Sequence, residues 1–91
     1  MSSMSSPGFR LSRHAREEIT RRAIPEEVVM DVLRSPEQTV ALPNRRMVLQ
    51  SRVALEGKTY LVRVIVVAQD EGQLVVTVYR TGKLGKYWRK E

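Results

Sequence analysis

The β-sheet of this protein is predicted from residues 47–68, which are MVLQSRVALEGKTYLVRVIVVA. Two runs rich in Val, Leu, Ile and Tyr flank the dipeptide Glu56-Gly57. Runs of this composition are typical of strands, and a two-residue loop with glycine is typical of a tight hairpin. We therefore predict antiparallel strands over residues 47–55 and 58–68.

Two further strands are predicted on either side of this hairpin. Residues 74–81 follow a turn signal at residues 70–72 and are again rich in Val, Thr and Tyr. Residues 39–42 form a shorter run that ends at the turn signal Pro43-Asn44. The expected sheet is an antiparallel meander of three to four strands.

The first third of the chain predicts two helices. Ser12 suits the N-cap of the first, whose apolar positions repeat every fourth residue. Pro25 starts a second helix, and Ser35-Pro36 ends it. The predicted fold is α+β, with two N-terminal helices packed on one face of the antiparallel sheet. Residues 1–9 are expected to be a disordered leader, and residues 10–91 a single domain.

Strand alternation divides the predicted sheet into an apolar and a polar face. We place Leu55 opposite Lys58 and assume that Ala68 faces Leu74 in the last hairpin. Leu74, Val76 and Val78 then join the apolar face, which the helices are expected to cover. The polar face carries Gln50, Arg52, Arg63, Thr77, Tyr79 and Thr81, with Tyr79 opposite Arg63. If it is open to solvent, this face can hold a phosphodiester, although it also suits an ordinary solvated surface.

Composition narrows the classes of function. The 91 residues carry a net charge of +6, and most of the bases are arginine, which contacts phosphate in a bidentate manner. This charge suits nucleic acid, although solubility or an acidic protein partner would also explain it. The chain lacks cysteine, contains one histidine and has no apolar run long enough to cross a bilayer. We expect no metal, no cofactor, no membrane contact and a cytoplasmic location.

Two further features suit an RNA ligand. The C-terminal segment interleaves Arg80, Lys83, Lys86 and Arg89 with Tyr87 and Trp88, a mixture suited to phosphate contact and base stacking. The alternative is that the aromatic residues pack on the core. His14 is the one histidine of the chain, and histidine is the residue type best suited to act as a general acid or base near neutral pH. The alternative for His14 is an inert surface position.

The chain resembles a family of small bacterial proteins of unassigned function. The resemblance is carried by SRHA at 12–15, RAIPEEV at 22–28, VVTVYRTGK at 75–83 and KYW at 86–88, and it spans about residues 10–89. Its members often look like toxins of toxin–antitoxin pairs, and their fold is similar to that of the RelE and ParE toxins. The chain departs from the expected pattern in having Ala23 in place of glycine and Gly82 in place of serine.

The resemblance implies a growth-inhibiting ribonuclease held in check by a small antitoxin, which we expect to be acidic. By analogy it points to His14, Arg63, Thr77 and Tyr79 as catalytic residues, with Lys83 and Lys86 as phosphate contacts. Together with the basic residues Arg52, Arg80 and Arg89, these form the predicted RNA site. We expect a metal-independent endoribonuclease. The alternatives are a non-catalytic toxin, as among the gyrase inhibitors of that fold group, or a simple nucleic-acid or protein-binding module.

Overall fold

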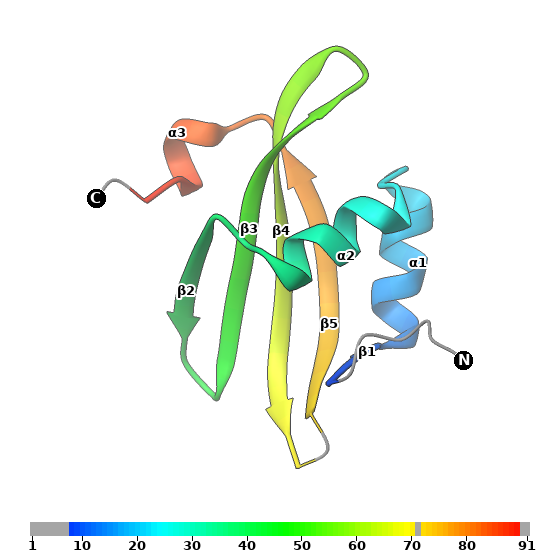
Figure 1. Ribbon diagram of the computed structural model, residues 1–91, viewed down its shortest axis with the longest axis vertical. Coiled ribbons are helices and arrows are strands. Elements are labelled where there is room, and N and C mark those ends of the chain that lie inside the picture. The colour runs from blue at the N-terminus through cyan, green and yellow to red at the C-terminus, as the bar shows by residue number, and fades with distance from the viewer. Residues whose placement is uncertain (1–7, 71, 90–91) are drawn as a thin grey trace.

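The computed structural model describes residues 8–70 and 72–89 of the chain. Within them the fold is a five-stranded mixed sheet with three helices (Figure 1). In chain order the elements are β1 (Phe9–Leu11), α1 (Arg13–Arg21), α2 (Glu26–Arg34), β2 (Gln38–Leu42), β3 (Arg46–Leu55), β4 (Lys58–Gln69), β5 (Gly72–Thr81) and α3 (Leu84–Tyr87). None of the helices in this part of the chain is long and apolar enough to cross a membrane.

The predicted fold class is wrong in two respects. The strands lie in the order β1-β5-β4-β3-β2, and β1 pairs with β5 in parallel, so the sheet is mixed and has five strands. The helices are also not simply two N-terminal elements, because β1 precedes them and α3 follows the sheet. A three-residue strand such as β1 has too few positions to show an alternating pattern, which is why the sequence did not predict it. Phe9, placed in the predicted leader, begins β1, and the rest of that leader lies mostly outside the described residues.

The helices begin where their capping residues predict. The Ser12 hydroxyl accepts a hydrogen bond from the backbone N–H of Ala15 at 3.0 Å, which satisfies one free donor of the first turn of α1. Pro25 is the N-cap of α2, and Glu26 and Glu27 place negative charge in its first turn. The start of α1 confirms the sequence prediction, and α2 begins at Glu26, one residue after the predicted first helical position at Pro25.

Helices α1 and α2 bury their apolar sides on one face of the sheet (Figure 1). The core joins helix residues to side chains from β3, β4 and β5. Its fully or almost fully buried members are Ala15, Ile19, Ile24, Val29, Val32, Leu33, Leu49, Val62, Val64, Val66, Val75 and Val78. Because burial of apolar area is the main favourable term in folding, this face stabilises the domain.

The pairing of β3 with β4 confirms the predicted hairpin. Leu55 lies opposite Lys58, and Gln50 lies opposite Arg63. The loop residues Glu56 and Gly57 have φ values of 54° and 81°, the left-handed values that a tight hairpin loop requires.

The pairing of β4 with β5 is right near Tyr79 and wrong further on. Tyr79 lies opposite Arg63 as predicted, but Ala68 lies opposite Gln73, not Leu74. A β-bulge between Ile65 and Val66 shifts the register, since Val66 pairs with Val75. The predicted apolar trio is therefore wrong: the core residues of β5 are Val75 and Val78. Bulges redirect side chains in this way and often lie beside functional sites.

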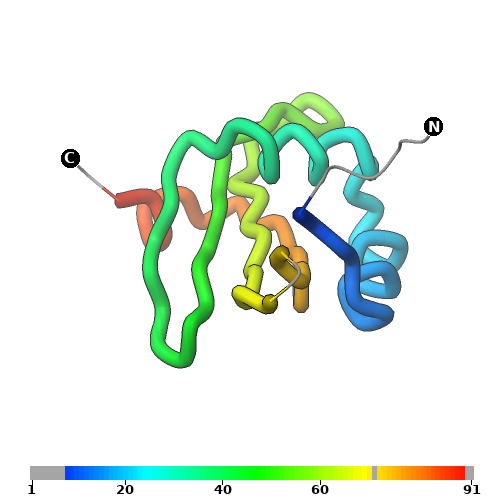
Figure 2. The backbone as a smooth tube through the Cα atoms, turned by 60° about the horizontal axis from the view of Figure 1, so that its bottom comes forward, coloured from blue at the N-terminus to red at the C-terminus, as the bar shows by residue number. Residues whose placement is uncertain are grey.

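The second face of the sheet is not open to solvent throughout, in contrast to the prediction. Val48, Gln50 and Leu61 lie on this face and are at most 1% exposed. The chain after β5 folds back through α3, whose Tyr87 carbonyl accepts a hydrogen bond from Gln50 at 3.2 Å. Figures 1 and 2 show α3 beyond β3, on the other side of the molecule from α1. Both faces of the sheet thus carry a covering element.

Candidate nucleic-acid interface

Arg63 is the centre of a polar cluster on the second face of the sheet. Its Nε donates to the Gln50 side-chain oxygen at 2.8 Å, and its Nη1 donates to the Tyr79 hydroxyl at 2.6 Å. These three side chains come from β3, β4 and β5, and the strand register places them side by side. We call Gln50, Arg63 and Tyr79 the arginine network.

The acceptors of the arginine network are neutral. None of the ion pairs formed among residues 8–70 and 72–89 includes Arg63. A half-buried guanidinium without a carboxylate keeps its full positive charge available to an incoming anion. The arrangement therefore suits a ligand with phosphate groups.

The amide of Gln50 fixes the position of Arg63. Gln50 is fully buried, and its Nε2 donates both to the Gln38 side-chain oxygen at 2.8 Å and to the Tyr87 backbone carbonyl. With its NH₂ group occupied by two acceptors, its oxygen is left to accept from Arg63. The orientation of the guanidinium is thus set by contacts that reach β2 and α3.

Two tyrosine rings adjoin the Arg63 guanidinium. Its Cζ atom is 4.4 Å from the centroid of the Tyr87 ring and 5.7 Å from that of Tyr79. The two rings meet edge to face with centroids 6.4 Å apart. Such contacts hold a cation in place without neutralising it. They also place aromatic surface next to the charge, as a ligand with both phosphates and bases requires.

Helix α1 runs alongside β5 in the same direction (Figure 1). At its start, the Ser12 N–H donates to the Val75 carbonyl at 2.9 Å, and the Ser12 hydroxyl donates to the Val76 carbonyl at 3.3 Å. At its end, the Arg22 guanidinium lies 5.9 Å from the Tyr79 ring centroid. The start of α1 therefore lies beside Val76 of β5, and its end lies beside Tyr79 of the same strand.

This alignment places His14 two residues after Ser12, near the level of Val76 and Thr77. The imidazole is exposed, and Thr77 is half-buried opposite Ile65, on the same face as Arg63. His14 and Arg22 are separated by eight positions, which is roughly 12 Å along a helix. Among the contacts of the described residues, Arg63 is hydrogen-bonded to Tyr79. The residue at the end of α1 that contacts Tyr79 is Arg22, not His14.

Glu18 is a buried carboxylate one turn before Arg22. It is 5% exposed, it accepts from the Arg22 Nε at 2.6 Å, and it also accepts from Arg21 Nη2. The hydrogen bond from Arg22, followed by that from Arg21, lowers the pKa of Glu18 below its ordinary value. Glu18 is therefore ionised at neutral pH and holds Arg22 beside Tyr79.

Arg52 lies on the same sheet face as Arg63 but in a different environment. It donates through Nε and Nη2 to the two carboxylate oxygens of Glu37 at 3.2 and 3.3 Å, and its Cζ is 4.1 Å from the Trp88 ring centroid. These bonds lower the pKa of Glu37, whose carboxylate neutralises Arg52. Trp88 is half-buried by this contact and is not part of the apolar core, so the alternative of packing on the core is not confirmed for it.

The other predicted phosphate contacts are divided between two places. Arg80 lies opposite Val62, so it points to the other face, where its Cζ is 4.6 Å from the Tyr60 ring centroid and its Nη2 is 3.8 Å from a Glu56 oxygen. Lys83, Lys86 and Arg89 are exposed around α3. The structure thus places Arg63, Tyr79 and Thr77 on one face of the sheet and Arg80 on the other. The Nζ atom of Lys86 is 5.3 Å from the centroid of the Tyr87 ring.

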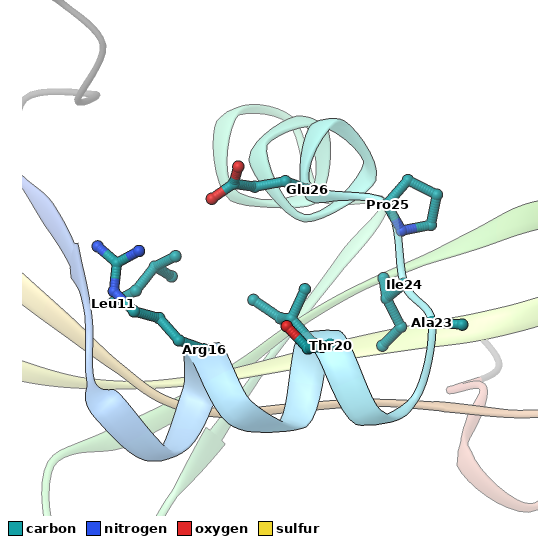
Figure 3. A pocket seen from close by; sticks show the side chains of 8 residues that line it. Leu11, Arg16, Thr20, Ala23, Ile24, Pro25 and Glu26 are labelled. Carbon is teal, nitrogen blue, oxygen red and sulfur yellow. The ribbon is translucent and has the colours of Figure 1, made fainter.

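A groove lies elsewhere on the molecule. About 480 Å³ in volume, it separates α1 from the start of α2, with Arg16 and Thr20 on one wall and Glu26 on the other (Figure 3). None of the predicted site residues lines it. The cluster at β4, β5 and α3 is therefore separate from this groove.

Sequence reasoning missed several members of this cluster. Gln50 was placed on the polar face but not assigned a role, although it is opposite Arg63 in the predicted register. Glu18 and Arg22 have the four-residue spacing of a helical ion pair and share a helix side with His14. That spacing was a usable signal. The contact of Tyr87 with Arg63 had no such signal, because it depends on the path of the chain after β5.

Comparison with known proteins identifies one family. The profile of a family described as a domain of unknown function (DUF4258) matches residues 11–80. No curated protein matches the chain, and no solved structure does. The matched region begins before α1 and ends at the last residues of β5, so it contains His14, Arg22 and the arginine network.

Proposed function

The chain belongs to the DUF4258 family, and we propose that it binds RNA on the arginine network and cleaves it as a metal-independent endoribonuclease. The observation that carries this proposal is the state of Arg63. It is held by two neutral oxygens from Gln50 and Tyr79 and lies beside two aromatic rings. A guanidinium so placed can bind a phosphodiester, and the rings can contact a base.

The proposed chemistry uses the 2′-hydroxyl of the RNA as nucleophile. The 2′-oxygen attacks the adjacent phosphorus and releases the 5′-oxygen of the next nucleotide, which leaves a cyclic phosphate and a 5′-hydroxyl. His14 is the proposed base that takes the 2′-hydroxyl proton. Arg63 and the Thr77 hydroxyl stabilise the negative charge that develops on the phosphate oxygens.

Tyr79 is the proposed proton donor to the leaving 5′-oxygen. Its hydroxyl oxygen accepts a hydrogen bond from Arg63, so its own proton is directed away from the guanidinium and toward a ligand. Proton exchange with water then restores Tyr79 and His14 for the next cycle.

The test is cleavage of a single-stranded RNA oligonucleotide by purified protein in EDTA, with products examined for cyclic phosphate ends. We expect the parent protein to cleave and His14→Ala to lose at least about a hundredfold in rate, the usual contribution of a general base. Thr20→Ala, an exposed substitution on the same helix away from the network, is the matched control and should cleave normally. No cleavage, or equal cleavage by parent and His14→Ala, contradicts the catalytic proposal.

The biological role that we propose is that of a toxin restrained by a small acidic antitoxin in the cytoplasm. The support is the resemblance of the motifs at residues 12–15 and 75–83, together with the net charge of +6, which favours an acidic partner. Growth arrest on expression, relieved by an acidic protein from a neighbouring gene, is the expected outcome. Toxicity that persists with intact RNA and with His14→Ala would instead favour a non-catalytic toxin, and harmless expression with salt-sensitive RNA binding a simple RNA binder.

A further inference from the structure

A second guanidinium adjoins the Tyr79 ring. Arg22, at the C-terminal end of α1, places its Cζ 5.9 Å from the ring centroid, and Arg63 places its Cζ 5.7 Å from the same point. One charge comes from the helical layer and the other from the sheet. Both guanidinium groups therefore adjoin the ring of Tyr79 on β5.

Arg22 is oriented by an acid that is itself withdrawn from solvent. Glu18 is 5% exposed, whereas the Arg22 side chain is 41% exposed. The hydrogen bonds of Arg22 to side chains in the described part of the chain use Nε alone. The outer Nη atoms, which form the fork that matches two phosphate oxygens, are left for a ligand.

Arg21 offers an internal comparison. It also donates to Glu18, but through an Nη atom, and its side chain is 68% exposed. Among the cation–ring contacts of the described residues, Arg22 reaches Tyr79 and Arg21 does not. Two adjacent arginines thus share one carboxylate, and one of them is turned toward the arginine network.

We propose that Arg22 is a second RNA-binding residue of this site and that Glu18 is its positioning residue. The inference rests on the proposed function in that the ligand is an RNA strand, but it does not require the strand to be cleaved. Arg22 contacts one phosphate of the strand through its Nη fork, while Arg63 contacts the phosphate at Tyr79. Glu18 touches no RNA, and it acts only by holding Arg22.

The experiment measures binding of a single-stranded 2′-O-methyl RNA oligonucleotide by fluorescence anisotropy at several salt concentrations. This probe has no 2′-hydroxyl nucleophile, so failure of the cleavage proposal does not affect the result. Arg22→Ala is expected to weaken binding about tenfold and to reduce the slope of log affinity against log salt by about 0.7, the value for one phosphate contact on a single strand. Arg21→Ala, with the same loss of charge, is expected to change affinity less than about threefold.

Glu18→Gln gives the sharpest result. It makes the protein more positive by one charge, so general electrostatic attraction predicts tighter RNA binding. A positioning role predicts weaker binding by about fivefold to tenfold, because Arg22 loses the carboxylate that holds it. Tighter binding by Glu18→Gln, or equal losses in Arg21→Ala and Arg22→Ala, would overturn the proposal.

Folding of each variant is checked by thermal unfolding, because Glu18 is buried. If Glu18→Gln does not fold, Arg22→Lys decides the question, since it keeps the charge at an exposed position and replaces the guanidinium, with its Nη fork and its Nε–H, by an ammonium group. We expect Arg22→Lys to bind at least threefold more weakly, and binding equal to the parent would contradict a bidentate contact.

Discussion

The two faces of the sheet are held together by different interactions. The face under α1 and α2 is a continuous apolar core, whereas the face under α3 joins polar side chains through directed hydrogen bonds from Gln50 and Arg63. Apolar packing is non-directional and tolerates substitutions of similar volume, but a hydrogen-bonded network loses specific partners when one member changes. The first face therefore determines stability, and the second determines where the cation and the hydroxyl lie.

The largest expected effect is on the apolar face. Leu33→Ala removes a side chain that is 4% exposed and leaves a cavity, so we expect a loss of about 2–5 kcal/mol in unfolding free energy. Urea unfolding followed by circular dichroism measures this loss. The affinity of the folded fraction for 2′-O-methyl RNA should be unchanged. A proportional loss of affinity in the folded protein would show that the two faces are not separable.

The next largest effect on stability is expected for Arg63 on the polar face, and Arg52 on the same face is its comparison. Arg63→Ala leaves the buried oxygen of Gln50 without its donor, which costs about 1–3 kcal/mol in stability, and it removes the proposed phosphate contact. Arg52→Ala removes a half-exposed partner of Glu37 and should cost at most about 1 kcal/mol.

Anisotropy with the same RNA probe checks the functional half of this comparison. We expect Arg63→Ala to lose about tenfold or more in affinity, and Arg52→Ala to lose less, because its charge is already neutralised by Glu37. Equal losses of affinity would mean that the RNA binds to the general positive charge of the surface rather than to the arginine network.

Tyr79→Phe separates the hydroxyl of Tyr79 from its ring. The ring contacts with Arg22 and Arg63 are kept, while Arg63 Nη1 loses its acceptor, so we expect about 0.5–1.5 kcal/mol of destabilisation. RNA cleavage should fall far more than RNA binding, since the ring remains. Unchanged cleavage in EDTA would remove Tyr79 from the proton-transfer role.

The smallest effect is a loss of stability in acid. Glu18 and Glu37 have folded-state pKa values below the ordinary value of 4.5, because arginines hydrogen-bond to their ionised forms. Since the unfolded chain binds protons more readily, this stabilisation is present above pH 4.5 and is lost as the pH falls through the lowered pKa values.

Urea midpoints measured from neutral pH into the acid range test this expectation. The midpoint should fall in acid, and Glu37→Gln should flatten that fall without affecting the apolar core. A midpoint that rises as the pH falls would contradict the ion-pair account of both carboxylates.

Much of this fold could be predicted from local patterns. The loop at Glu56-Gly57 and the helix start at Ser12 follow from turn and capping chemistry. The pairing of Arg63 with Tyr79 is as predicted because the β-bulge between Ile65 and Val66 compensates for the one-residue error at Ala68. The bulge before Val66 could not be predicted, because an extra residue in an apolar strand leaves no mark on its composition. β1 was missed because three residues show no period.

The candidate site was predictable in its sheet part only. Strand register brings together Gln50, Arg63 and Tyr79, which are distant in sequence but adjacent by pairing. The contribution of Tyr87 depends on how the chain turns after β5, and the approach of Arg22 depends on how α1 lies along that strand. These are tertiary contacts, and no local pattern encodes them. Prediction selected His14 by its chemistry, while the observed contacts of α1 with the network are made by Arg22.

The central claim, that the polar face at β4 and β5 holds the RNA backbone, is tested most directly by nuclear magnetic resonance. Protein labelled with ¹⁵N is titrated with 2′-O-methyl RNA, and the side-chain Nε–H signals of its arginines are followed. The account predicts that Arg63 and Arg22 shift strongly while Arg80, on the other face, does not. A shift confined to Arg16 of the groove, with Arg63 unmoved, would contradict it.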